Sequence, residues 1–83
     1  MLSCQLSIYP LASTDFSSII LSAIDHLKPF EQHGLTITVG EMSTVIKGPD
    51  HVVWDAVQTL FKKTQQSGYP IVMNTTFSNE CGL

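Results

Sequence analysis

The sequence predicts an α+β domain whose strands and helices follow the order β-α-β-β-α-β. Two segments carry apolar residues at spacings of three and four, which is the pattern of a helix with one buried face. Other segments alternate apolar and polar residues, as half-buried strands do. Between two of these, the turn-prone run Gly40-Glu41-Met42-Ser43-Thr44 separates two stretches rich in β-branched residues. This arrangement predicts a hairpin in the middle of the chain.

The first half of the chain predicts one strand and one helix. Apolar residues at positions 2, 4, 6 and 8 alternate with polar ones, so a strand is expected here, ending at Tyr9-Pro10. Side-chain oxygens of residues 13 to 15 can then begin a helix. Pro29 disfavours helical angles at Lys28, so this helix should end about there. Its apolar stripe consists of Phe16, Ile19, Ile20, Ala23, Ile24 and Leu27.

The second half predicts a hairpin, a helix and a last strand. Strands are expected over residues 35 to 39 and about 43 to 47, although a slip of one residue would reverse the faces of the latter. Pro49 suits the first position of a second helix, and Gly68 suits a left-handed cap at its end. The last strand should run from Ile71 to about Phe77, and residues 78 to 83 should form a flexible tail. The stripe of the second helix is Val53, Ala56, Val57, Leu60 and Phe61.

This order of elements is the ferredoxin-like arrangement, in which a four-stranded antiparallel sheet carries both helices on one face. Right-handed crossovers place the first and third strands in the centre of the sheet. We therefore expect a single domain over residues 1 to 83. Its core should consist of Leu2, Cys4, Leu6, Ile8, Leu35, Ile37 and Val39, packed against Ile20, Ile24, Val57 and Phe61.

The opposite face of the sheet should be polar and almost uncharged. A face that only met solvent would more often hold Lys and Glu, so this composition favours contact with another subunit. The simpler alternative is the ordinary strand preference of Thr and Val. Under unbroken alternation, the face carries Ser3, Gln5, Ser7, Thr36, Thr38, Val72, Asn74 and Thr76.

Length and composition exclude several classes of partner. A chain of 83 residues buries only about 60% of its unfolded surface, so the monomer should be marginally stable. A net charge of −3, with four Lys and no Arg, provides no basic patch for nucleic acid or anionic membranes. No apolar run approaches the roughly 20 residues of a membrane span, and the first residues contain no basic region followed by a hydrophobic stretch. We expect a cytoplasmic protein without membrane insertion.

The sequence offers little for catalysis or metal binding. No Ser or Cys stands in a recognisable arrangement with His and an acid, and glycine-rich phosphate loops are absent. The three His lie on different predicted elements without ligand spacing, and Cys4 and Cys81 should be reduced. Trp54 is better explained by packing than by ligand stacking. We therefore expect a binding protein with neither enzymatic activity nor a metal or cofactor.

Three short motifs carry a resemblance to a known family. Ile8-Tyr9-Pro10-Leu11 ends the first strand, Ser or Thr opens the helix that follows, and the Gly40 to Thr44 run leads to Lys47-Gly48. In this order they resemble the small thiamine-binding protein family, over nearly the whole chain. The tail departs from it, since Phe77-Ser78-Asn79-Glu80 stands where members often carry charged residues. The resemblance implies a ferredoxin-like fold, sheet-paired dimers that assemble into a tetramer, and a site for thiamine or its hydroxymethylpyrimidine moiety near subunit contacts.

The resemblance also points to candidate ligand-binding residues. Tyr9 or Met42 would flank the ring, and Glu41 would lie near the thiazolium cation. Ser43 and Thr44 have a plainer role in shaping a hairpin, as Met42 has in filling the core and Asn74 in pairing with a neighbouring subunit. The donors and acceptors that can match an aminopyrimidine are Gln5, Ser7, Thr38, Ser43, Thr44 and Asn74.

Two other functions remain open from the sequence. Regulatory modules that bind amino acids at subunit interfaces share this order of elements, and fold alone does not exclude one. A structural oligomer without any ligand is the other alternative.

Overall fold

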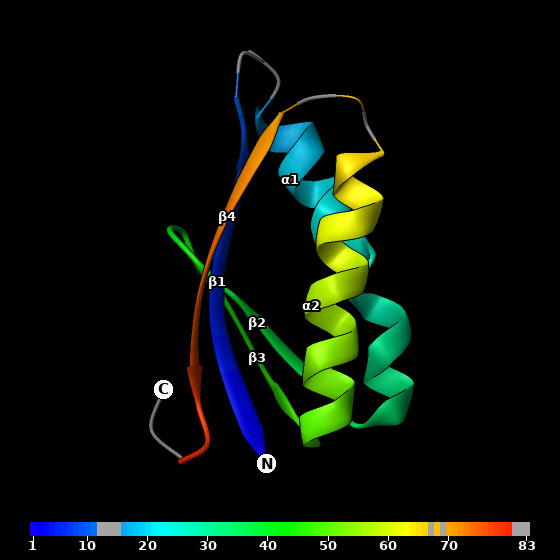
Figure 1. Ribbon diagram of the computed structural model, residues 1–83, viewed down its shortest axis with the longest axis vertical. Helices are drawn as coiled ribbons and strands as arrows, with labels where there is room; N and C mark the ends of the chain where they lie inside the picture. The colour runs from blue at the N-terminus through cyan, green and yellow to red at the C-terminus, as the bar shows by residue number, and fades with distance from the viewer. Residues whose placement is uncertain (12–15, 67, 69, 81–83) are drawn as a thin grey trace.

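The computed structural model describes residues 1 to 11, 16 to 66, 68 and 70 to 80. The sheet has the strand order β2-β3-β1-β4, so β1 and β3 are central, and both helices cover one of its faces (Figure 1). All three strand pairs are antiparallel, which confirms the predicted fold. The elements are β1 (Leu2–Pro10), α1 (Phe16–Asp25), the 3-10 helix η1 (Lys28–His33), β2 (Thr36–Val39), β3 (Thr44–Gly48), α2 (Asp50–Gln65) and β4 (Ile71–Ser78).

The register of the strands places the predicted polar residues on the sheet face away from the helices. Ser7 lies opposite Asn74, and Gln5 lies between Val45 and Thr76. We call this surface the open face. The eight residues predicted for it lie there, and the pairing adds Tyr9, Val45, Lys47 and Ser78. Lys47 is the one charged side chain among them, so the open face is almost uncharged as predicted.

Several element boundaries differ from the prediction. Helix α1 ends at Asp25, three residues before Lys28, and η1 occupies most of the expected connection. Pro49 precedes the first residue of α2 and accepts hydrogen bonds from the amides of Val52 and Val53 through its carbonyl, both at 3.0 Å. Gly68 has the expected positive φ of 89°, but it lies beyond the helix end. The predicted helix start at residues 13 to 15 falls outside the described residues.

The core lies between the sheet and the two helices. Leu2, Cys4, Leu6, Ile8, Leu35 and Val57 are buried as predicted, and Ile37 is partly buried against them. Val39 was predicted for the core but is 58% exposed. It is the last residue of the edge strand β2, where it lines a cavity beside α1 rather than packing against that helix.

Strand β4 ends at Ser78, the residue with which the predicted tail begins. Ser78 is the last residue of β4, and its hydroxyl accepts a hydrogen bond from the amide of Glu80 at 3.2 Å. The same hydroxyl donates to the carbonyl of Glu80 at 3.1 Å. Residues 81 to 83 lie outside the described part of the chain.

Candidate functional site

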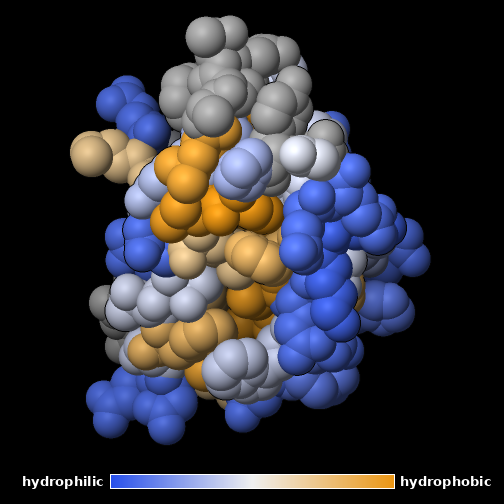
Figure 2. Space-filling view, turned by 45° about the horizontal axis from the view of Figure 1, so that its top comes forward, coloured by the Kyte–Doolittle hydropathy of each residue, from blue (hydrophilic) through white to orange (hydrophobic). Residues whose placement is uncertain are grey.

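A cavity of about 390 Å³ opens where β1, the β2–β3 hairpin and α1 meet. Its inner wall is apolar, formed by Leu6 and Ile8 of β1, Ile20 and Ile24 of α1, and Leu60 of α2. Apolar side chains also reach the surface between the sheet and the helices, beside a hydrophilic strip (Figure 2). We call this space the hairpin cavity. Its volume falls in the range of roughly 300 to 1,000 Å³ that small-molecule sites occupy.

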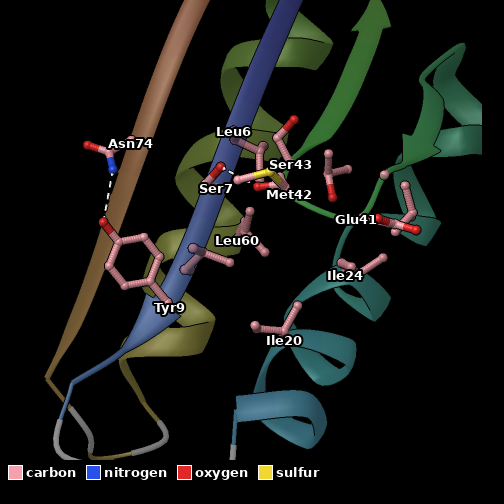
Figure 3. A pocket seen from close by; sticks show the side chains of 14 residues that line it. Leu6, Ser7, Tyr9, Ile20, Ile24, Glu41, Met42, Ser43, Leu60 and Asn74 are labelled. Carbon is pink, nitrogen blue, oxygen red and sulfur yellow. Dashed lines mark hydrogen bonds between the residues drawn. The ribbon is translucent and has the colours of Figure 1, made fainter.

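The hairpin cavity brings together most of the residues that the resemblance singled out. Its rim is polar, and Glu41 with Ile24 lies on one side of it while Tyr9 with Asn74 lies on the other (Figure 3). Gln5 does not line the cavity but donates from Nε2 to Ser43 Oγ at 3.2 Å. Thr38 lies apart, paired with Val45 on the open face. The predicted residues that line the cavity are Ser7, Tyr9, Glu41, Met42, Ser43, Thr44 and Asn74.

Hydrogen bonds hold the hairpin against β1. The amide of Gly40 donates to the carbonyl of Ser43 at 2.9 Å and closes the turn. A Cβ on Gly40 would approach that same carbonyl oxygen to 2.9 Å, so a side chain at this position would push the turn open. Ser7 Oγ donates to the carbonyl of Met42 at 3.0 Å. The turn is therefore fixed at the rim of the hairpin cavity, although the Met42 side chain itself is 90% exposed.

The far side of the rim is a second polar pair. Asn74 Nδ2 donates to Tyr9 Oη at 3.1 Å. The carbonyl oxygen of the Asn74 amide is a further acceptor and the Tyr9 hydroxyl a further donor. Among the described residues that line the cavity, Glu41 is the only charged one. The site thus combines an apolar interior, several hydroxyl and amide groups, and one acid, which suits a small heterocycle with a positive charge.

The apolar residues of the cavity wall were predicted only as core. Ile20 and Ile24 are partly exposed because the hairpin cavity, rather than another side chain, faces part of their surface. Helical periodicity predicts that both point toward the sheet, and that expectation is correct. Helical periodicity does not, however, indicate the space that lies between Ile20, Ile24 and β1.

Nothing in the described residues indicates a nucleophile or a metal site. Burial raises the pKa of the Cys4 thiol to about 11, and a hydrogen bond with the backbone of Thr76 opposes this only in part. Cys4 is a free thiol, and its raised pKa keeps it protonated at neutral pH. The described residues contain no group of three or more His, Cys, Asp or Glu side chains that could hold a metal ion. No helix in the described ranges is long and apolar enough to span a membrane.

Sequence comparison relates the chain to one family. Residues 1 to 82 match the model of the YKOF-related family. A protein of Bacillus subtilis (strain 168), named as a candidate HMP/thiamine-binding protein, YkoF, is 35% identical over 77 residues. The match covers 93% of this chain but only 36% of that protein. The chain therefore spans about a third of the length of this relative.

Solved structures share the fold at low sequence identity. A hypothetical protein of Methanocaldococcus jannascii superimposes with a TM-score of 0.82 at 18% identity, covering 99% of this chain and 82% of that one. A candidate thiamine biosynthesis/salvage protein of Thermotoga maritima gives 0.77 at 20% identity, with 98% and 85% covered. A domain of unknown function from Bacillus cereus gives 0.77 at 23% identity, with 95% and 75% covered.

Proposed function

The chain belongs to the YKOF-related family, and we propose that it binds thiamine or the hydroxymethylpyrimidine moiety of thiamine without transforming it. The observation that carries this proposal is the hairpin cavity, where an apolar interior meets a rim of hydroxyl, amide and carboxylate groups. The name of the Bacillus subtilis relative, a candidate HMP/thiamine-binding protein, supports the same ligand class.

The two rings of thiamine match different parts of the cavity. A methylated aminopyrimidine is flat and largely apolar on its faces, so the partly exposed side chains of Ile20 and Ile24 can pack against it. Its ring nitrogens and amine need partners at the edge of the ring. The thiazolium carries a positive charge, which Glu41 at the rim would attract. Among the lining residues that the structure describes, no cation opposes that attraction.

Calorimetric titration tests the proposal directly. We expect thiamine or hydroxymethylpyrimidine to bind saturably with Kd below about 1 mM, which corresponds to roughly 4 kcal/mol of binding free energy. The same experiment with a set of amino acids is the comparison. Binding of an amino acid, and not of either thiamine-type ligand, would identify a regulatory module instead. Absence of heat with every ligand would leave a structural oligomer as the better function.

We further propose that the chain assembles through its open face as a dimer of dimers. Ser7, Tyr9 and Asn74 belong both to the open face and to the rim of the hairpin cavity. A second copy on this face would therefore border the ligand site. The support is the almost complete lack of charge on the face, where Lys47 is the one exception among the paired residues.

Light scattering after size exclusion tests the assembly. At micromolar concentration we expect a mass of four chains, and a stable monomer would contradict the proposal. Thr36→Lys places a second charge on the open face beside Lys47. Burying it against another copy would be costly, so the assembly should dissociate. Asp55→Lys, an exposed position on α2, is the matched control and should leave the mass unchanged.

A further inference from the structure

Strand β1 is paired on both sides along only part of its length. Its pairing with β3 ends at Leu6, opposite Thr44, whereas its pairing with β4 continues to Pro10, opposite Ile71. The chain of β3 turns into the hairpin at this point, and the gap is the hairpin cavity (Figure 3). From residue 7 onward, the β3 side of β1 is an open strand edge that faces the cavity.

The alternation of an antiparallel ladder decides which main-chain groups face that gap. Each residue directs its N–H and C=O to the same side, and successive residues alternate sides. The amide of Leu11 donates to the carbonyl of Pro70 at 2.7 Å, so Leu11 faces β4. By this alternation, the main-chain groups of Tyr9 and Ser7 also point toward β4. Those of Leu6, Ile8 and Pro10 point to the opposite side of the strand.

Ile8 is therefore the residue of β1 that directs both main-chain groups into the hairpin cavity. Leu6 is already opposite Thr44, and Pro10 has no N–H. Ile8 as a whole residue is 7% exposed and belongs to the core, and it also lines the hairpin cavity. The alternation along the strand directs its main-chain groups to that side. Within the described residues, β3 has ended before it reaches Ile8. A main-chain amide left without any partner beside apolar walls is unfavourable, so this pair requires water or a ligand.

The form of this edge selects a small planar group over a peptide. Adding a strand to a sheet edge needs donors and acceptors repeated along the strand, and here a single pair is followed by Pro10. One donor beside one acceptor fits a heterocycle that presents an acceptor beside a donor. The 4-aminopyrimidine edge has this pattern, with a ring nitrogen next to an exocyclic amine.

We propose that the main chain of Ile8 forms hydrogen bonds with the amine edge of the aminopyrimidine in the hairpin cavity and so contributes to ligand specificity. This inference rests on the proposed function. The Ile8 carbonyl accepts from the exocyclic amine, and the Ile8 N–H donates to the adjacent ring nitrogen. A pyrimidine that lacks the amine leaves the carbonyl unpaired, which costs roughly 10- to 100-fold in affinity. Because the backbone makes this contact, the side chains in the sequence do not indicate it.

Nuclear magnetic resonance on ¹⁵N-labelled protein tests this contact. In the free protein, the Ile8 amide should exchange with solvent much faster than the Leu6 amide, which is paired with β3. Saturating hydroxymethylpyrimidine should slow that exchange and move the Ile8 amide proton downfield, with little change at Leu6. Calorimetry on the same sample compares hydroxymethylpyrimidine with its analogue lacking the amine. The analogue should bind roughly 10- to 100-fold more weakly.

A pair of variants checks the result independently. Ile8→Pro removes the N–H, whereas Ile8→Ala truncates the side chain and keeps the N–H, so the Pro variant should bind at least tenfold more weakly than the Ala variant. Unfolding curves identify a variant that does not fold, and the resonance test then decides. Binding with an unmoved Ile8 amide, or with equal affinity for the analogue, overturns this inference alone. Absence of binding by both thiamine and hydroxymethylpyrimidine overturns the proposed function as well.

Discussion

The two ends of β1 lie in different surroundings, although the strand pattern is the same along its whole length. At the end that includes Cys4, the strand has β3 and β4 as neighbours, and the core beside it is fully buried at Ile46 and Val53. Trp54 and Phe77 stack there with ring centroids 4.3 Å apart. At the other end, Ile8 borders the hairpin cavity. The comparison teaches that the site arises because β3 is shorter than β1, and not because the apolar pattern fails.

The same substitution at both ends should give the largest difference. Ile46→Ala at the closed end removes a side chain with no exposed area, and we expect it to lower the free energy of unfolding by about 2 to 5 kcal/mol. Ile24→Ala at the cavity should cost about 1 kcal/mol, because its side chain already borders open space. Urea unfolding measures both values. Equal losses would contradict the distinction between a filled and a hollow end.

The pH dependence of stability at alkaline pH tests whether Cys4 is buried at the closed end of β1. The pKa of Cys4 is raised from 9.0 to about 11 by burial, so the unfolded state ionises first as the pH rises. The stabilising effect is complete below pH 9 and is lost between pH 9 and 11, by up to about 3 kcal/mol at 1.4 kcal/mol per pKa unit. Unfolding curves across this range measure the loss. Cys4→Ala removes the titrating group, so its stability should fall less steeply over the same interval, and parallel curves would argue against a buried thiol.

Substitutions at the cavity rim should affect binding and leave stability nearly unchanged. Asn74→Ala removes the amide that pairs with Tyr9, and Ser43→Ala removes the hydroxyl that holds Gln5. We expect each to weaken thiamine binding about tenfold, as the loss of one hydrogen bond does. Thr38→Ala, on the open face outside the cavity, is the control. If calorimetry finds unchanged affinity in both rim variants, the ligand binds elsewhere.

The smallest effect concerns charge at the cavity mouth. Glu41→Gln keeps the shape of the side chain but removes the carboxylate, so we expect thiamine to bind about two- to fivefold more weakly, as for an exposed charge pair. Hydroxymethylpyrimidine, which has no thiazolium, should bind unchanged. Glu31→Gln in η1, distant in the fold from the hairpin, serves as the control. An equal effect on both ligands would mean that Glu41 does not contact the cationic ring.

The sequence predicted the fold because its local patterns agree with the global arrangement. Alternation along β1 identified its buried face, and the motif at Gly40 to Thr44 identified the hairpin and, through the resemblance, most of the cavity rim. Two features depend on what lies opposite in space. Val39 continues the alternation of β2 and yet is exposed, because it borders the hairpin cavity rather than a helix. The role inferred for Ile8 depends on where β3 ends, and the side-chain pattern does not predict that position.

Strand β4 has a consequence for the behaviour of the protein in concentrated solution. It forms one edge of the sheet. Because its even-numbered residues direct their main-chain groups to β1, those of Ile71, Met73, Thr75 and Phe77 point outward. The strand contains neither a charge nor a proline that would discourage edge-to-edge stacking. Such a segment has the composition of those that stack into cross-β fibrils. Storage at high concentration should therefore favour slow fibril growth wherever this edge is left uncovered.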